Sequence, residues 1–331
     1  MSQPNERKLN WGVVGTGGIS NKFIADLPFT SNGVAYAASS RSMESAEAFV
    51  QKYNMTRAYD DYDKMLEDPE LDAVYVGTPH PLHKENVLKA LHAGKHVLCE
   101  KPFTINAGEL EEMIALAREK KLFLMEGMWT RFLPPLRKVR EWIRDGRIGE
   151  VLLTKAEFGF RMPWEPEHRL LNPELGGGAL LDTGIYPVSF ASMIFGAQPE
   201  KIVSTAHMGE TGVDEQFSII LGYSGGRTAT LNGSIRLLLP NEAYIHGTEG
   251  YIHIPQFLFS REASLYVEGE EVETFTDDRE CEGYAFEAEE AGRLILEGKL
   301  ESDIMPLDES LAIMRILDEV RAQWGFKYSW E

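Results

Sequence analysis

The chain has 331 residues, of which 33 are basic and 52 are acidic, so its formal net charge at neutral pH is −19. At roughly 150 residues per domain, this length suggests about two domains, and 43% hydrophobic and 26% charged residues are typical of a globular rather than a disordered or collagen-like chain. Because so large a negative charge repels phosphate backbones and anionic membranes, we expect neither nucleic acid nor membrane as a partner.

Cysteine content and the start of the chain indicate the compartment. Cys99 and Cys281 are too few for a disulfide framework and are typical of a reducing environment. Residues 1–10 are polar, unlike a secretory signal, and no run reaches the 18 or so uncharged apolar residues of a membrane-spanning helix. We therefore expect a soluble, cytoplasmic protein.

From residue 9 to about 128, short apolar runs alternate with amphipathic segments. The runs predict strands at 11–14, 34–39, 73–77, 96–99 and 122–125, and the segments predict helices at 42–54, 82–93 and 107–121. Strands that alternate with helices of this length imply right-handed crossovers and a parallel, doubly wound sheet. We therefore expect residues 1–128 to form an α/β domain of the dinucleotide-binding Rossmann type.

The second half has a different pattern. It predicts helices at 133–145, 285–297 and 307–324, and strands at 151–160, 216–223, 227–238 and 243–246. Polar and apolar residues alternate along 228–237, and Tyr223 to Gly226 form a hairpin signal, so the sheet is expected to be open and mainly antiparallel with one wetter face. Residues 129–331 are therefore predicted to be an α+β domain for substrate binding and oligomerisation, with the C-terminal helix packing back on the first domain.

A glycine-rich loop follows the first predicted strand. Gly15 permits a tight turn, Gly17 lets backbone N–H groups approach a pyrophosphate at the start of the next helix, and Ser20 is small enough for that helix to pack near the strand. A bare glycine-rich turn is the alternative, but the position after a first strand favours a dinucleotide site. The loop residues predicted to contact the cofactor are Gly15, Thr16, Gly17, Gly18 and Ile19.

The second predicted strand indicates which dinucleotide is bound. NAD enzymes usually carry an acidic residue there, but none occurs between Gly33 and Met43. Ser40 is a hydrogen-bonding residue and Arg41 is able to form a charge-assisted fork with a 2′-phosphate. We therefore predict NADP(H) in preference to NAD(H), the alternative being that Arg41 is merely a solvated residue of a turn.

Three further motifs follow: Thr78 to His83 (TPHPLH), Glu100-Lys101-Pro102, and Gly176 to Tyr186 (GGGALLDTGIY). Together with the glycine loop they resemble the glucose–fructose oxidoreductase/inositol dehydrogenase (Gfo/Idh/MocA) family, in the right order over nearly the whole chain. Phe103-Thr104, residues 128–134 and the Tyr at 186 are most similar to the branch of dimeric dihydrodiol dehydrogenases and NADP-dependent xylose dehydrogenases. Many family members carry His where this chain has Tyr186.

The resemblance implies Lys101, Asp182 and Tyr186 as catalytic residues. A phenol with an ordinary pKa near 10 is protonated at neutral pH, which suits Tyr186 to act as a general acid. The ammonium of Lys101 would lower that pKa, and Asp182 would orient Lys101 and Tyr186. Alternatively, Lys101 is the direct acid/base and Tyr186 only binds substrate, or Asp182 caps a helix.

The same resemblance implies further contacts. On the cofactor side these are Thr78, Pro79, His80, His83, Glu100, Lys101, Trp129 and Arg131, with Glu126 nearby, and on the substrate side Lys101, Trp129, Trp164, Asp182 and Tyr186, with Arg161, His168 and Arg169 as further candidates. Core packing is the alternative for His83 and both tryptophans, and a lid loop is a further one for Trp164. No metal site is predicted, because no carboxylate or thiol near the two histidines completes one.

The implied function is NADP(H)-dependent transfer of a hydride between nicotinamide C4 and a carbinol or carbonyl carbon of a sugar, polyol or cyclic diol. Two alternatives stay open: a catalytically silent NADP-binding sensor, and an NAD-dependent glycosidase of the same family. The resemblance also implies a homodimer or a higher even oligomer, which would cover the open sheet face.

Overall fold

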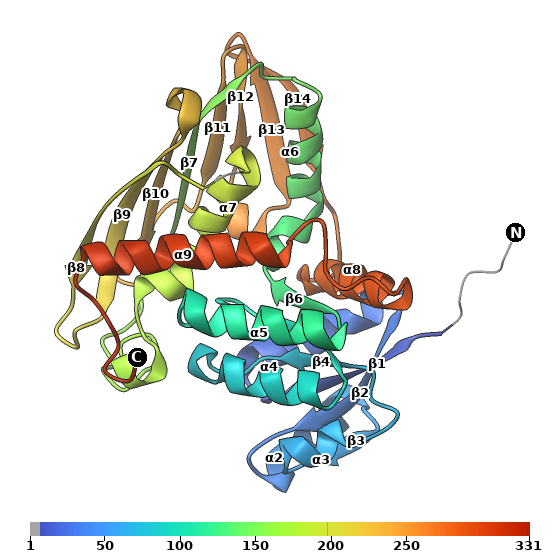
Figure 1. Ribbon diagram of the computed structural model, residues 1–331. Helices are drawn as coiled ribbons and strands as arrows, with labels where there is room; N and C mark the ends of the chain where they lie inside the picture. The colour runs from blue at the N-terminus through green and yellow to red at the C-terminus, as the bar shows by residue number, and fades with distance from the viewer. Residues whose placement is uncertain (1–6, 197) are drawn as a thin grey trace, which may run out of the picture. The chain divides into compact units, whose positions relative to one another are not determined.

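The computed structural model describes residues 7–196 and 198–331 (Figure 1). Residues 1–6, part of the polar N-terminal stretch, lie outside the described residues, as does residue 197. The chain divides into two compact units. The first unit takes its described residues from 1–104, 108–129 and 279–310, and the second from 105–107, 130–278 and 311–331. Because these units are defined by compactness and are discontinuous in sequence, the boundary between folding domains predicted after residue 128 stays a prediction.

A six-stranded parallel sheet forms the centre of the first unit, with strand order β3-β2-β1-β4-β5-β6. Its strands are β1 (Leu9–Val14), β2 (Gly33–Ser39), β3 (Arg57–Tyr59), β4 (Ala73–Val76), β5 (His96–Glu100) and β6 (Leu124–Gly127). This order confirms the predicted doubly wound fold, and it reverses direction between β1 and β4, where such sheets bind ligands. The short strand β3 was not predicted because its three residues, one exposed and two half-exposed, give no apolar run.

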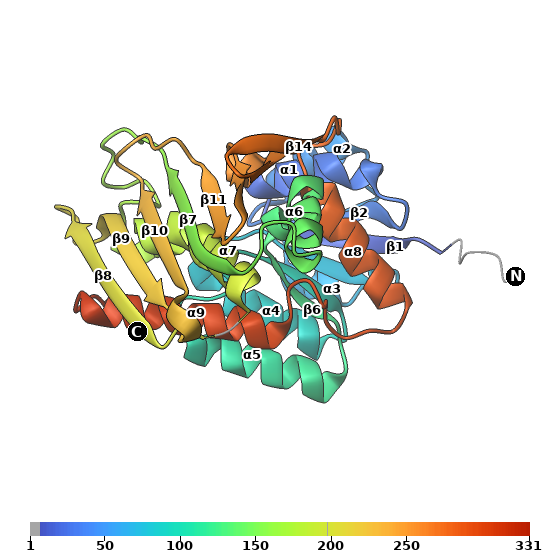
Figure 2. The same cartoon turned by 90° about the horizontal axis from the view of Figure 1, so that it is seen from above.

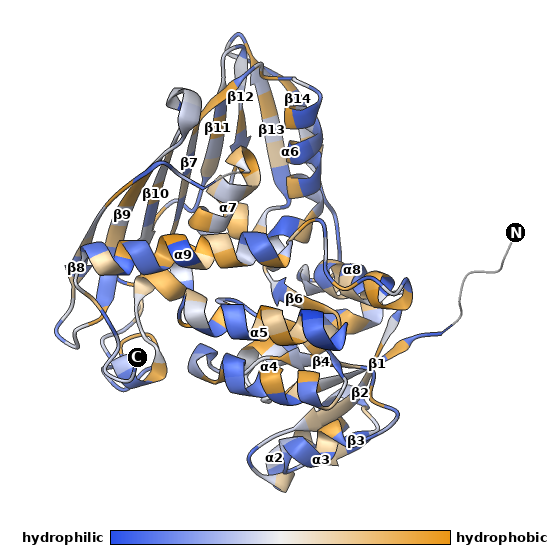
Figure 3. Cartoon of the chain, in the orientation of Figure 1, coloured by the Kyte–Doolittle hydropathy of each residue, from blue (hydrophilic) through white to orange (hydrophobic). Residues whose placement is uncertain are grey.

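The helices of the first unit are α1 (Gly18–Asp26), α2 (Met43–Tyr53), α3 (Tyr62–Leu66), α4 (His83–His92), α5 (Ala107–Lys120) and α8 (Tyr284–Leu296). Hydrophilic and hydrophobic residues share the surfaces of α4 and α5, as expected of amphipathic helices (Figure 3). In the core, Phe23 of α1 stacks on Tyr75 with ring centroids 3.8 Å apart and meets Trp11 edge-on at 5.7 Å.

Helix α8 joins this unit from far along the chain. Its N-terminus is held by Asp26 at the end of α1, whose carboxylate accepts the backbone N–H groups of Glu282 (2.9 Å), Gly283 (2.7 Å), Tyr284 (2.7 Å) and Ala285 (3.3 Å). A carboxylate at this position satisfies amides that have no partner inside the helix and complements the helix dipole. Asp26 therefore fixes α8 against the nucleotide-binding fold.

An eight-stranded sheet forms the second unit, with order β14-β13-β12-β11-β7-β10-β9-β8. Its strands are β7 (Val151–Gly159), β8 (Lys201–Met208), β9 (Asp214–Gly222), β10 (Thr228–Ser234), β11 (Ala243–Gly247), β12 (Gly250–Ile254), β13 (Glu262–Val267) and β14 (Glu270–Thr276). Only β7 and β10 pair in parallel, which confirms a mainly antiparallel sheet. The predicted strand at 227–238 ends earlier, at Ser234, whose Oγ accepts the N–H groups of Arg236 and Leu237 at 2.9 Å each.

The helices of the second unit are α6 (Pro134–Arg144), α7 (Ile185–Phe195) and α9 (Leu307–Gln323), the last of which begins within the first unit. Helices α7 and α9 lie on one face of strands β7 to β10, and no helix of the described chain covers the other face there (Figure 2). Residues 173–195 are long and apolar enough to cross a membrane by length and composition alone, but they are mostly buried within the protein, as in the core helix of a folded domain.

Candidate active site

The glycine loop lies at the point where the strand order of the first sheet reverses. Gly15 has φ of +87°, and a Cβ there would lie 3.2 Å from the side chain of Thr78, which follows β4. Gly17 and Gly18 are exposed, and no atom lies within 4 Å of the place a Cβ would take. Helix α1 begins after Gly17 without a side-chain cap. The loop therefore offers open backbone amides at a helix N-terminus, which is the arrangement that binds a pyrophosphate.

Ser20 occupies the third small-residue position of the loop. Its side chain is fully buried against Gly77 at the end of β4, so that any Cβ at Gly77 would clash with the Ser20 hydroxyl. Close packing of helix and strand is thus achieved by a pair of residues, a serine on the helix and a glycine on the strand. The sequence pattern singled out only the serine.

Arg41 lies at the end of β2, next to the loop. Thr16 and Ser40 approach each other with their hydroxyl oxygens 3.2 Å apart, which joins the loop to this turn. The Arg41 side chain is exposed and has no hydrogen bond or ion pair with another described residue. A guanidinium beside the loop is therefore available to a phosphate, and together with the uncapped α1 it fits a phosphorylated dinucleotide.

Lys101 follows β5 at the same edge of the sheet. Its backbone N–H donates to Oε2 of the buried Glu100 at 3.2 Å, while the Tyr75 hydroxyl donates to Oε1 of Glu100. On α8, Glu287 is fully buried, and neither of its carboxylate oxygens has a hydrogen-bond partner among the described residues. Burial and then the neighbouring Glu100 raise the pKa of Glu287 well above its usual range. No sequence motif singles out Glu287.

His83 ties two of these strand-end loops together. It is buried, with Nδ1 2.9 Å from the carbonyl oxygen of Pro102 and Nε2 2.8 Å from that of Thr78. Burial lowers the pKa of His83 to about 4, so the ring is neutral at pH 7 and donates to one carbonyl at a time. Any contribution of His83 to cofactor binding is therefore indirect, through the conformation in which it holds these two loops. His80 is also buried, with its ring centroid 6.5 Å from that of His83. Pro79, in the loop between Thr78 and His80, is exposed.

At the end of β6 and just after it, three residues predicted to lie near the cofactor are buried. Glu126 accepts the backbone N–H of Phe103 at 3.2 Å, and Trp129 stacks on Tyr284 of α8 at 4.8 Å, both within the first unit. Arg131 belongs to the second unit, where its guanidinium donates to the side chain and the carbonyl of Ser189 at 2.9 and 2.7 Å.

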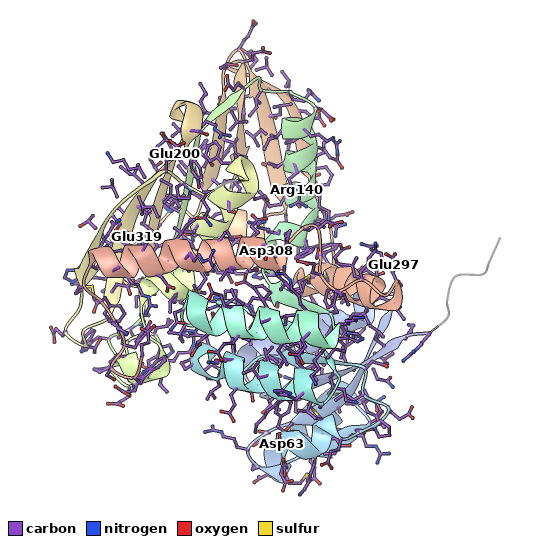
Figure 4. All side chains as sticks on the ribbon, viewed as in Figure 1. Asp63, Arg140, Glu200, Glu297, Asp308 and Glu319 are labelled. Atoms are coloured by element: carbon purple, nitrogen blue, oxygen red, sulfur yellow. The ribbon has the colours of Figure 1, made fainter. Side chains whose placement is uncertain are left out.

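The backbone next to Arg131 is fixed as well. Arg140, labelled on α6 in Figure 4, donates to the carbonyl oxygen of Arg131 at 2.8 Å. Trp129 and Arg131 thus each contribute to the packing and hydrogen bonding of their own unit.

In the second unit, Asp182 lies within a π-helical turn, Leu180–Gly184, that runs directly into α7. Such turns are rare and occur mostly at functional sites. Asp182 is buried and accepts from the Arg169 guanidinium at 2.9 Å, and Tyr186, also buried, meets Phe158 of β7 edge-on at 5.7 Å. Because Asp182 is already inside the helix, the alternative that it caps the helix is wrong.

The glycine run before this helix is packed against protein. A Cβ at Gly177 would lie 2.8 Å from the carbonyl oxygens of Leu170 and Asn172, and one at Gly178 would clash with the carboxylate of Asp214. The Tyr328 hydroxyl donates to the Gly177 carbonyl at 2.7 Å. The run is thus required by close protein packing, and sequence reasoning missed Asp214 and Tyr328 because they approach from distant parts of the chain.

Trp164 lies on the long loop between β7 and the π-helical turn, and 52% of its surface is exposed. With Arg161 of the same loop and Arg236 after β10, it lines an open cavity of about 690 Å³. Arg236 is fixed by Glu215 and His207, each 2.8 Å from its Nη1. Exposure favours a lid or surface role for Trp164 over the alternative of a core tryptophan, and His168 is exposed on the same loop. Within residues 7–196 and 198–331, no group of three or more His, Cys, Asp or Glu side chains is placed to hold a metal ion.

Comparisons with known proteins agree with this geometry. Residues 9–128 match the oxidoreductase family with an NAD-binding Rossmann fold (Gfo/Idh/MocA), and residues 136–253 match the Gfo/Idh/MocA C-terminal domain. The chain is 42% identical over 330 residues to trans-1,2-dihydrobenzene-1,2-diol dehydrogenase of Xenopus laevis, which covers 96% of this chain and 98% of that protein. It is 38% identical over 331 residues to the Homo sapiens protein of the same name, with 97% and 98% covered.

Solved structures share the fold over almost the whole chain. A 3-ketoreductase from Actinomadura kijaniata, in complex with NADP and TDP-benzene, superposes with a TM-score of 0.85 at 27% identity and covers 96% of this chain and 98% of its own. An aldose-aldose oxidoreductase from Caulobacter crescentus has a TM-score of 0.87 at 24% identity, with 97% and 99% covered, and shows the likeness of fold.

Proposed function

Because this chain belongs to the Gfo/Idh/MocA family and is an NAD(P)-dependent oxidoreductase, we propose that it uses NADP(H) to interconvert a carbinol and a carbonyl of a small polyhydroxylated compound. The observation that carries the cofactor choice is Arg41, exposed and unpaired among the described residues at the end of β2, where NAD enzymes usually carry a carboxylate. When bound, the dinucleotide would supply the hydride acceptor or donor at nicotinamide C4. Gly15 to Ile19 would hold its pyrophosphate, and Ser40 with Arg41 its 2′-phosphate.

The proton chemistry is assigned to three side chains. In the oxidation direction, Tyr186 would take the hydroxyl proton, with Lys101 stabilising the phenolate and Asp182 orienting the pair. The alternative, in which Lys101 takes the proton and Tyr186 binds the substrate, uses the same residues. Support comes from Lys101 at the ligand-binding edge of the first sheet and from the π-helical turn that carries Asp182 immediately before Tyr186.

The substrate class follows from the names of the relatives and from the chemistry of the second unit. Relatives are named for a cyclic diol, and an NADP-bound neighbour is named a 3-ketoreductase. Asp182 and Arg169 would supply an acceptor and donors for hydroxyl groups, and Phe158 an apolar wall beside Tyr186. A sugar, polyol or cyclic diol is therefore the proposed substrate. The sensor and glycosidase alternatives lack the support that the redox names of these relatives give to net oxidoreduction.

The cofactor proposal is tested with Arg41→Ala. We expect the ratio of kcat/KM with NADP⁺ to that with NAD⁺ to fall by about tenfold or more, because one charge-assisted contact to the 2′-phosphate is lost. Arg137→Ala is the matched control, since Arg137 is an exposed arginine of α6 whose side chain makes no hydrogen bond or ion pair with another described residue. An unchanged ratio in Arg41→Ala would contradict the assignment.

We also propose a homodimer, or a higher even oligomer, formed through the open face of the eight-stranded sheet. Val203 and Ile220 are paired across β8 and β9 on that face and are 48% and 49% exposed. Further along the sheet, Tyr244 stacks on His253 with centroids 4.4 Å apart. A second copy would remove this apolar and aromatic surface from water.

The cytoplasm is the proposed location. Support comes from Cys99 and Cys281, which are both buried free thiols, a state that a reducing compartment preserves. Fractionation of cells that make the protein, followed by immunodetection, tests this: recovery with the membrane or secreted fraction would contradict it.

A further inference from the structure

The helix that carries Asp182 and Tyr186 begins without a cap of its own. Its first helical residue is Ala179, preceded by Gly178, which has no side chain. The first amides of a helix have no partner inside it and need an external acceptor. At most helix starts a Ser, Thr, Asp or Asn supplies that acceptor, but Gly178 has φ of +132°, a conformation that L side chains rarely adopt.

The acceptor comes instead from the start of β9. Oδ2 of Asp214 accepts the backbone N–H of Leu180 at 2.6 Å, and the amide of Ala179 also donates to this carboxylate. Asp214 is only 1% exposed, and its Oδ1 lies so close to Gly178 that any Cβ there would clash. The lack of a side chain at Gly178 therefore leaves room for the Asp214 carboxylate. This carboxylate takes the place of the side-chain cap that the helix lacks.

The C-terminal segment holds the same turn from another side. The hydroxyl of the buried Tyr328 donates to the carbonyl oxygens of Gly177 (2.7 Å) and Gly176 (3.2 Å). The Arg321 guanidinium lies 5.4 Å from the Tyr328 ring centroid and pairs with Glu331 at 2.6 Å. The glycine run is thus fixed by groups from β9 and from the end of the chain.

We propose that Asp214 is a positioning residue for the reaction: by accepting the first amides of this helix, it sets where Asp182 and Tyr186 stand. The inference rests on the proposed roles of those two residues. Asp214 acts through the backbone, since Leu180 is two residues from Asp182 and both lie in the same π-helical turn. A displacement of about 1 Å at a reacting group is enough to lower a rate strongly.

The ionisation of Asp214 supplies a readout that a merely structural role would not move. Burial raises the pKa of Asp214 to about 7, against the lowering effect of the Leu180 and Ala179 amides and of Arg321. The charged and titratable groups that act on it are Arg321 of α9 and Tyr328 of the C-terminal segment, and Tyr328 in turn faces Glu331 and Asp182. Because an ionised carboxylate accepts amide hydrogens more strongly than a neutral acid, we expect kcat to rise with pH through about 7.

The test compares Asp214→Ala, which removes the acceptor, with Asp214→Asn, which keeps an acceptor oxygen but does not ionise. Glu200→Gln, an exposed carboxylate directly before β8 of the same sheet, is the matched control. We expect Asp214→Ala to lower kcat by about tenfold or more at an unchanged Kd for NADP(H), and Asp214→Asn to restore most of kcat while losing the pH dependence near 7. Hydrogen exchange of residues 179–186, measured by mass spectrometry without substrate, should be faster only in Asp214→Ala.

A kcat for Asp214→Ala within about twofold of wild type, or an unchanged pH profile in Asp214→Asn, would overturn the proposal. If Asp214→Ala does not fold, Asp214→Asn carries the test alone: loss of the pH dependence of kcat near 7 with most of kcat retained supports the proposal, and an unchanged pH profile overturns it. If the wild type is inactive, the proposed function is overturned. Faster hydrogen exchange in Asp214→Ala would even then support Asp214 as the acceptor for the first amides of the helix.

Discussion

Lys101 is the side chain on which the proposed chemistry depends most. Its backbone is fixed by the bond to Glu100, so removal of the side chain should leave the loop in place. We expect Lys101→Ala to lower kcat by a factor of about 10² or more at an almost unchanged Kd for NADP(H), because a proton-transfer or oxyanion-stabilising group is lost. Lys84→Ala, which removes an exposed ion pair to Glu112, is the control. Near-normal turnover of Lys101→Ala would contradict the mechanism.

His83 makes the stability of the protein depend on pH. Its pKa is lowered by burial from 6.5 in the unfolded chain to about 4, so between these values the unfolded state binds more protons than the folded state. Its contribution is therefore present above about pH 6.5 and lost as the pH falls toward 4, by up to about 3 kcal/mol.

The free energy of unfolding measured in urea at several pH values checks this. For His83→Asn, in which residue 83 does not titrate, the curve should be flatter than that of wild type between pH 4 and 6.5. The free energies of unfolding of wild type and His83→Asn should therefore differ less at pH 4.5 than at pH 7. Parallel curves would show that His83 is not the titrating group.

Some site residues could be located from the sequence and others could not. Gly15, Arg41, Thr78 and Lys101 each follow a recognisable apolar strand, and the carboxyl ends of parallel strands share one edge, so their common location follows from the strand pattern. The positions of Asp214, Tyr328 and Glu287 depend on contacts between segments far apart in the chain, for which one sequence gives no signal.

At the scale of single elements, α8 depends on a residue of another helix. We expect Asp26→Ala to lower the free energy of unfolding by about 2 to 4 kcal/mol, because four backbone amides at the start of α8 lose a charged acceptor. Asp26→Asn, which keeps one acceptor oxygen, should lose less.

Urea unfolding of both Asp26 variants measures this difference, and circular dichroism checks that they are folded. Equal stability of Asp26→Ala and wild type would show that α8 is held by its apolar face alone.

Elements with a regular apolar period were predictable, whereas those of the sheet edges were not. Strands β8 and β14 carry mostly exposed or half-exposed side chains, and β12 and β13 carry tyrosines and a histidine on the open face. Their stability comes from pairing with neighbouring strands, which local sequence does not show. The π-helical turn at 180–184 was likewise not predicted from the sequence.

At the scale of the whole molecule, charge and assembly are the properties to explain. The side chains of Asp63, Glu200, Glu297, Asp308 and Glu319 are exposed (Figure 4), in keeping with a net charge of −19 carried on the surface. Against this repulsion, association needs an apolar face, and Ile220 lies on the open face of β9.

We expect Ile220→Lys to shift the mass measured by light scattering toward that of a monomer, because a charge would be buried at the proposed contact. Leu238→Lys, at an exposed position beyond the end of β10, is the control and should leave the mass unchanged. A wild-type protein that is already monomeric would refute the proposed dimer.

The proposed oxidoreduction is tested most directly by the absorbance at 340 nm of purified protein given NADP⁺ or NAD⁺ with trans-dihydrodiols, aldoses and polyols, and NADPH or NADH with the matching carbonyl compounds. We expect turnover on at least one of these compounds, with a higher kcat/KM for NADP(H) than for NAD(H). No change in absorbance with any pair, from protein that binds NADP(H) by fluorescence, would contradict net oxidoreduction of this substrate class.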